Sequence, residues 1–115
     1  MAIEHLTSLE QLEQCIQASF AQVVLLFKHS TRCPVSTAAD NNFHKFAESE
    51  MAERLRLVHL DLIAHRDISN AIATKTGIAH QSPQAIYLID GKAVWHKSHL
   101  AITPEELTRG LEAIA

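Results

Sequence analysis

The sequence contains few cysteines, glycines and prolines. Its 115 residues include two cysteines, three glycines and three prolines, and they contain no linker, repeat or low-complexity stretch. Two cysteines cannot form a disulfide framework, so cross-links do not stabilise the fold. The longest apolar runs, such as residues 23–27, fall far short of the roughly twenty residues that cross a bilayer. We therefore expect no membrane segment.

The sequence also lacks an excess of positive charge. Ten Lys and Arg residues stand against thirteen Asp and Glu residues, which gives a formal net charge of -3. No basic field is available to neutralise a phosphate backbone, so we expect no nucleic acid partner. Residues 1–6 carry no basic segment followed by a continuous apolar one, as an export signal would. The expected location is the cytoplasm, where free thiols stay reduced.

What is present fits one compact domain over residues 1–115. The hydrophobic content of 47% is enough, at this length, to bury one core without disulfides. Residues 1–6 are expected to lead into a helix. Periodicity and composition predict the elements in this order: a helix at 8–19, a strand at 22–28, a helix from 34 to near 53, a strand at 55–62, a helix at 67–76, strands at 85–89 and 92–96, and a helix from 103 to about 114.

Local signals set the ends of these elements. Thr7 and Glu10 fit a capping box before the first helix, and Pro34 suits the first position of the second helix. Gly77 is expected to close the third helix in a left-handed conformation, and Asp90-Gly91 favours a tight hairpin turn. Parallel strands joined by crossover helices, then a hairpin and a covering helix, indicate an α/β thioredoxin-like fold. We expect a central mixed sheet of about four strands flanked by helices.

Cys33 lies where a helix begins directly after a buried strand. The thiolate is the attacking form of cysteine, and the first turn of a helix offers unpaired amides and the positive end of the helix dipole. Arg32 precedes the cysteine and His29 is close in sequence, so both favour the anion if they point inward. We interpret Cys33 as a catalytic thiol, with Pro34 starting the helix behind it.

The other cysteine and the missing partner of Cys33 complete the thiol inventory. Cys15 lies on the same face of the first helix as Leu12 and Ile16, which indicates a buried structural thiol. Three residues after Cys33, where a two-thiol motif has its second cysteine, the sequence has Ser36. No internal disulfide closes there, so another thiol must resolve a mixed disulfide. Ser36 either donates a hydrogen bond to the sulfur or is simply a polar residue of the first turn.

Ser82 and Pro83 immediately precede a predicted strand, where a proline is poorly tolerated unless it marks a bend. An ordinary trans bond is the alternative; we expect a cis bond. In the thioredoxin fold this loop faces the active cysteine. The backbone of Ser82 would then be free to pair with a bound peptide or thiol.

Three motifs in order resemble the YtxJ-like monothiol bacilliredoxins, over nearly the whole chain. They are HSTRCPVS at residues 29–36, HQSPQ at residues 80–84, and the segment from Gly91 to Thr103. Their order makes the resemblance more specific than a lone C-P-x-S. Arg32 departs from the family pattern, which usually has threonine there, and Val35 stands where isoleucine is usual.

The resemblance implies a monothiol thiol–disulfide oxidoreductase that removes bacillithiol, a low-molecular-weight thiol, from mixed disulfides with client proteins. Cys33 would be the nucleophile, with Pro34 and Ser36 as its catalytic neighbours and bacillithiol as the exchanging thiol in place of a tightly bound cofactor. The implied substrate-binding residues lie on two loops: Thr31, Arg32, Ser82 and Pro83. Because bacillithiol carries carboxylates, Arg32 or Lys28 would be its anion contact.

Two functions of other classes stay open on the sequence. Cys33 would supply one ligand per protomer to an iron–sulfur cluster shared between copies, as in monothiol glutaredoxins. Alternatively, the chain would be a non-catalytic thioredoxin-like module that docks partners at Ser82-Pro83 and uses Cys33 as a redox sensor. The eight histidines include the pair His96 and His99 but no compact set at zinc-site spacing, so no metal site is expected. His59 is expected to be half-buried on its strand.

Overall fold

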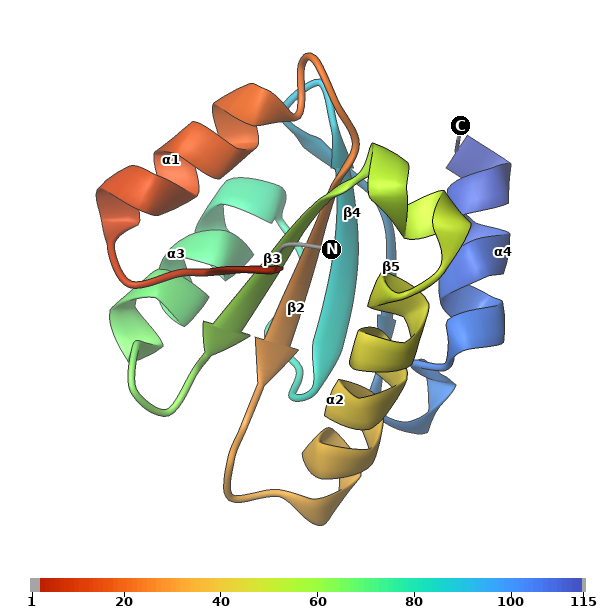
Figure 1. Cartoon of the computed structure of the whole chain (residues 1–115). Coiled ribbons are helices and arrows are strands. Elements are labelled where there is room, and N and C mark those ends of the chain that lie inside the picture. The colour runs from red at the N-terminus through yellow and green to blue at the C-terminus, as the bar shows by residue number, and fades with distance from the viewer. Residues whose placement is uncertain (1–2, 115) are drawn as a thin grey trace.

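The protein, described by a computed structural model over residues 3–114, is built around a five-stranded sheet (Figure 1). Across the sheet the strands run in the order β1-β3-β2-β4-β5. β1, β3 and β2 are parallel, β4 is antiparallel to β2, and β5 is antiparallel to β4. The strands are β1 (Ile3–His5), β2 (Val24–His29), β3 (Arg56–Asp61), β4 (Gln84–Ile89) and β5 (Lys92–Ser98).

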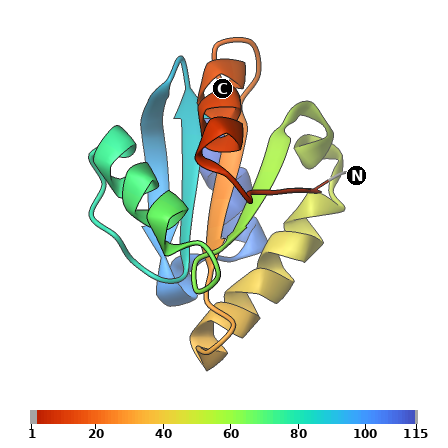
Figure 2. The same cartoon turned by 90° about the vertical axis from the view of Figure 1, so that its left-hand side faces the viewer.

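Helices cover both faces of the sheet, with α1 and α3 on one face and α2 and α4 on the other (Figures 1 and 2). The helices are α1 (Leu9–Ala18), α2 (Pro34–Ala47), α3 (Arg66–Thr76) and α4 (Pro104–Ile114), with 3-10 turns η1 (Glu50–Arg54) and η2 (His99–Ala101). No helix among the described residues is long and apolar enough to cross a membrane. The α/β fold class expected from the sequence is confirmed, with one strand more than the roughly four expected.

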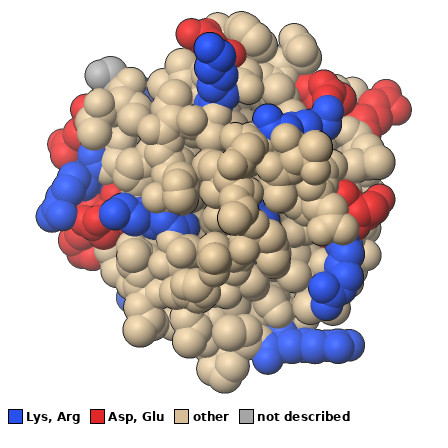
Figure 3. All heavy atoms as spheres, turned by 180° about the vertical axis from the view of Figure 1, so that it is seen from behind, with Lys and Arg blue, Asp and Glu red and all other residues tan. Residues whose placement is uncertain are grey.

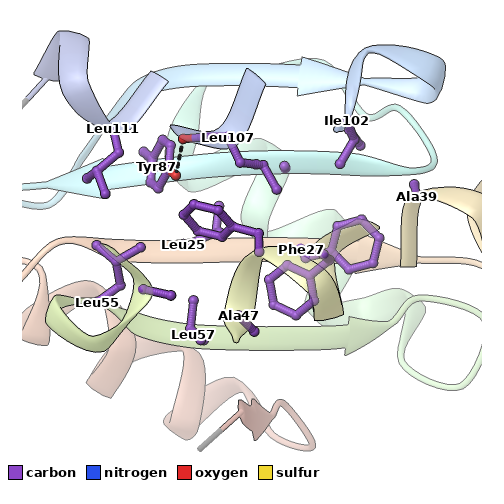
Figure 4. Close-up of a cluster of buried hydrophobic side chains, with 14 residues drawn as sticks. Leu25, Phe27, Ala39, Ala47, Leu55, Leu57, Tyr87, Ile102, Leu107 and Leu111 are labelled. Atoms are coloured by element: carbon purple, nitrogen blue, oxygen red, sulfur yellow. Dashed lines mark hydrogen bonds between the residues drawn. The ribbon is translucent and has the colours of Figure 1, made fainter. Parts of the chain in front are cut away.

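The core is divided between the two faces because successive side chains of a strand point in opposite directions. Leu25 and Phe27 of β2 pack with α2 and α4, whereas Leu26 packs with α1 and α3. Figure 4 shows the first of these clusters, in which the buried Tyr87 hydroxyl donates a hydrogen bond of 2.6 Å to the Leu107 carbonyl. All six residues of β2 are buried, as a central strand predicts.

The extra strand lies at the N-terminus, where the sequence suggested only a lead into a helix. Ile3–His5 pairs in parallel with β3, and Glu4 lies opposite Val58. The Arg56 side chain donates to the Glu4 carboxylate at 2.8 Å and fixes this edge. A strand of three residues has no periodicity of its own, and its partner is more than fifty residues away along the chain. The local sequence therefore could not identify it.

Two helix ends also differ from the prediction. Helix α1 is capped one residue later than the Thr7–Glu10 box, because the Ser8 hydroxyl accepts the Gln11 amide at 3.1 Å. Helix α2 ends at Ala47 instead of near residue 53, and η1 follows it. Ser49, whose backbone is extended with φ -76° and ψ 157°, separates the two segments, and the sequence pattern did not show this break. The left-handed Gly77 cap and the turn at Asp90 and Gly91, both with positive φ, are confirmed.

Candidate active site

Cys33 is the N-cap residue of α2. Its backbone is extended, with φ -117° and ψ 121°, and its carbonyl accepts the Thr37 amide at 3.1 Å. Pro34 occupies the first helical position and has no N–H, so Val35 and Ser36 supply the amides that the first turn leaves without intrahelical partners. The Cys33 side chain is partly exposed and makes no capping hydrogen bond within the described residues. This sulfur is accessible to another thiol or disulfide.

Ser36 is completely buried, and its hydroxyl connects the end of β2 with the loop that carries Cys33. Ser36 Oγ accepts the Ser30 amide at 2.8 Å and shares a hydrogen bond of 2.9 Å with His29 Nδ1. Among the side chains described, no hydrogen bond joins Ser36 Oγ to Cys33 Sγ. Ser36 is thus a polar residue of the first turn of α2 whose hydroxyl is bonded to His29 and Ser30.

A partly buried pair near His29 was not singled out as a site by the sequence. His59 Nε2 and Asp40 Oδ1 are 2.9 Å apart, and the His59 and His29 rings are centred 5.5 Å apart. Burial lowers the pKa of His59, while Asp40 acts in the opposite direction. His59 is 8% exposed, so it is more buried than the half-buried state expected. The spacing of Ser36 and Asp40, four residues apart on α2, was the one available signal.

The loop before β4 lies at the same end of the sheet as Cys33. Lys28, near the end of β2, is opposite Gln84, the first residue of β4, and β2 leads directly into the Cys33 loop. The Ser82-Pro83 peptide bond is cis, and the Pro83 carbonyl accepts the His99 amide at 3.0 Å. Pro83 is thus anchored to the end of β5.

Thr31 and Arg32 are exposed on the loop before Cys33. The Arg32 amide donates to Ser30 Oγ at 3.3 Å, and its guanidinium forms no ion pair among residues 3–114. Figure 3 shows basic and no acidic side chains along the lower edge of the rear face, the end at which Figure 1 places the β2–α2 loop. The loop therefore presents an unneutralised positive charge beside the thiol.

Lys28 does not fit the anion-contact role that the sequence suggested for it. Its side chain is completely buried, and burial lowers its pKa to about 8. Lys28 Nζ has no hydrogen-bond partner in the described part of the chain. An ammonium group inside the protein cannot contact a thiol bound at the surface, so of the two candidates only Arg32 is placed to do so.

Cys15 is buried on the other side of the sheet, as the structural interpretation predicts. It packs in the core beneath α1 and α3, whereas Cys33 begins α2 on the opposite face (Figure 1). Within residues 3–114, no group of three or more His, Cys, Asp or Glu side chains is arranged to hold a metal ion. The chemistry that this arrangement offers is that of one accessible thiol at a helix N-terminus.

Comparisons with known proteins agree with this reading of the geometry. The family of the monothiol bacilliredoxin BrxC matches residues 4–107. A solved thioredoxin-fold protein, provisionally described as an oxidoreductase, is 34% identical, with a TM-score of 0.83 over 95% of this chain and 93% of its own. Thioredoxin from Fasciola hepatica shares the fold at 12% identity, with a TM-score of 0.77 over 97% of this chain and 99% of its own. Thioredoxin from Trypanosoma brucei brucei also shares the fold, at 18% identity, with a TM-score of 0.74 over 98% of this chain and 90% of its own.

Proposed function

The chain belongs to the monothiol bacilliredoxin family, and from this we propose that it removes bacillithiol from mixed disulfides with cytoplasmic client proteins through Cys33. Its family and its thioredoxin-like fold make a thiol redox function the starting point. The observation that carries the proposal is the pairing of a partly exposed Cys33 at the start of α2 with a serine, Ser36, in place of a second thiol. Such a site can accept a small thiol and cannot expel it alone.

The exchange proceeds in two balanced steps. The Cys33 thiolate attacks the bacillithiol sulfur of the mixed disulfide, so a new Cys33–bacillithiol disulfide forms as the client–bacillithiol bond breaks. The client leaves as a thiolate and takes a proton from water. A second thiol then attacks the bacillithiol sulfur on Cys33, which returns the Cys33 thiolate and carries the bacillithiol away as a new disulfide. The number of disulfide bonds is unchanged in each step.

The residues around Cys33 have distinct parts in this scheme. The first-turn amides behind Pro34 and the dipole of α2 favour the thiolate, both as the attacking group and as the group released in the second step. Thr31 and Arg32 contact the bound thiol from the preceding loop, with the Arg32 guanidinium facing its carboxylates. The backbone of Ser82, held beside Pro83, aligns the disulfide for attack.

The test uses a purified protein that carries a single bacillithiol mixed disulfide as its substrate. On mixing with the reduced full-length chain, the client should be released as a free thiol while the mass of one bacillithiol appears on Cys33. Parallel reactions with glutathionylated and coenzyme A-modified forms of the same client establish the preference. Transfer of bacillithiol at least about tenfold faster than the others is the expected result.

Two controls complete this test. Cys33→Ser should transfer nothing, and Cys15→Ser should transfer as the wild type does. The proposal fails if the client keeps its bacillithiol, or if glutathione is transferred as fast as bacillithiol.

A further inference from the structure

We propose that His29 is a positioning residue of this exchange site, which acts on Cys33 through the hydroxyl group of Ser36. The inference rests on the proposed use of Cys33 as the exchanging thiol. His29 lies four residues before Cys33 at the end of β2, and it is 9% exposed. Within residues 3–114, no hydrogen bond joins the His29 ring directly to Cys33.

A continuous set of hydrogen bonds connects the two residues. His29 Nδ1 and Ser36 Oγ are 2.9 Å apart, and Ser36 Oγ accepts the Ser30 amide at 2.8 Å. The Ser30 carbonyl in turn accepts the Cys33 amide at 3.4 Å, which closes a turn over residues 30–33. The Ser36 hydroxyl thus holds the start of the loop that ends at the reactive thiol, and His29 holds that hydroxyl in place.

Both hydrogen bonds of the Ser36 hydroxyl hold this loop. The oxygen accepts the Ser30 amide, and the hydroxyl shares its second hydrogen bond with His29 Nδ1, whichever of the two groups carries the proton between them.

The surroundings of His29 contain few charged groups. Two of these groups come from β3. The ring centres of His59 and His29 are 5.5 Å apart, and Asp61 lies opposite His29 in the strand register. The Asp61 carboxylate is engaged with the amides of residues 63 and 64. From α2, Asp40 is bonded to His59. Within residues 3–114, the His29 ring makes one side-chain hydrogen bond, to Ser36, and no acidic side chain is bonded to it.

The experiment measures the alkylation rate of Cys33 by iodoacetamide at pH 7.5 in the full chain. Ser36→Ala and His29→Leu should each slow the reaction by about fivefold, because each releases the same hydrogen-bonded anchor of the Cys33 loop. The double variant should be slowed by about fivefold as well, and not by the roughly 25-fold product of two independent effects. His96→Asn, an exposed histidine on β5, is the matched control and should react like the wild type.

His29→Asn tests the hydrogen bond itself. An asparagine amide can still bond to Ser36, so the alkylation rate of this variant at pH 7.5 should stay within about twofold of the wild type. This rescue decides the question if His29→Leu does not fold.

Three results would overturn the inference: an unchanged rate in His29→Leu, additive losses in the double variant, or a loss in His29→Asn as large as that in His29→Leu. Iodoacetamide is uncharged and unrelated to bacillithiol. The inference can therefore hold even if the client test shows that another thiol is the substrate, and it can fail while bacillithiol transfer stands.

Discussion

The Cys15 thiol donates a hydrogen bond to the Glu4 carboxylate over 3.6 Å, and Arg56 binds the same carboxylate at 2.8 Å. Burial, reinforced by the charge of Glu4, raises the pKa of Cys15 to about 11. Cys33 is instead partly exposed at a helix N-terminus. The protein thus keeps one thiol protonated and enclosed and the other accessible.

This contrast predicts the order in which the two thiols react. At pH 8, about one Cys15 in a thousand is a thiolate, and its side chain is also out of reach of a reagent. Iodoacetamide should therefore label Cys33 more than about 100-fold faster than Cys15 in the native protein. Peptide mapping by mass spectrometry gives both rates, and in denaturant they should become similar. Equal native rates would refute the assignment of Cys33 as the working thiol.

A second prediction concerns the resolution of the mixed disulfide. Cys15 and Cys33 belong to helices on opposite faces of the sheet, so they cannot form a disulfide without local unfolding. Cys15→Ser should turn over within about twofold of the wild type, and the bacillithiol adduct on Cys33 should accumulate when no second thiol is added. Intact mass under non-reducing conditions checks this. The loss of two hydrogens, with activity abolished in Cys15→Ser, would indicate a two-thiol enzyme.

The sequence could predict those features that depend on local backbone chemistry. Pro34 starts α2 because its ring restricts the backbone to a helical φ and it has no N–H to leave unpaired. Gly77 ends α3 because glycine can adopt the left-handed conformation. Cys33 was recognisable because its chemistry follows from a strand, a helix start and its neighbours in the sequence. The absence of a second thiol was recognisable too, because Ser36 stands three residues after Cys33, where a two-thiol motif has its second cysteine.

Other features depend on residues that are distant in the sequence, and these were missed. The hydrogen bond between His29 and Ser36 requires β2 and α2 to meet at a particular angle, which no motif specifies. Lys28 looked available to a ligand because nothing in its neighbourhood shows which face of β2 is covered at its end. β1 forms by pairing with the free edge of β3, and that edge is not visible in the sequence around residues 3–5.

The buried Lys28 gives a prediction about stability. Because its pKa is lowered from 10.5 to about 8, its charge opposes folding by roughly 3 kcal/mol below pH 8. That penalty declines between pH 8 and 10.5, where the unfolded chain binds more protons than the folded one. Lys28→Met should therefore raise the free energy of unfolding by about 1–3 kcal/mol at pH 7, and by less at pH 9.5.

Urea denaturation at the two pH values measures this effect. Lys92→Met, at an exposed position of β5, is the control and should show no such pH dependence. No gain at pH 7, or a gain that is equal at both values, would show that the Lys28 amine is not destabilising in the folded protein.

The last prediction concerns substrate charge at Arg32. This exposed guanidinium has no ion pair within the described residues, so its field acts on whatever approaches Cys33. Arg32→Glu should reduce the rate of bacillithiol transfer by about tenfold at low salt, with a smaller difference at high salt, because repulsion then replaces attraction. Arg32→Thr, which removes the charge without reversing it, should fall between the wild type and Arg32→Glu.

Lys92→Glu makes the same change in net charge at the far end of the sheet and should leave the rate unchanged. Alkylation of Cys33 by uncharged iodoacetamide should stay within about twofold in Arg32→Glu, since the substitution alters attraction of the substrate and not the thiol. Equal losses in Arg32→Glu and Lys92→Glu would show that Arg32 contributes only to the overall charge of the protein.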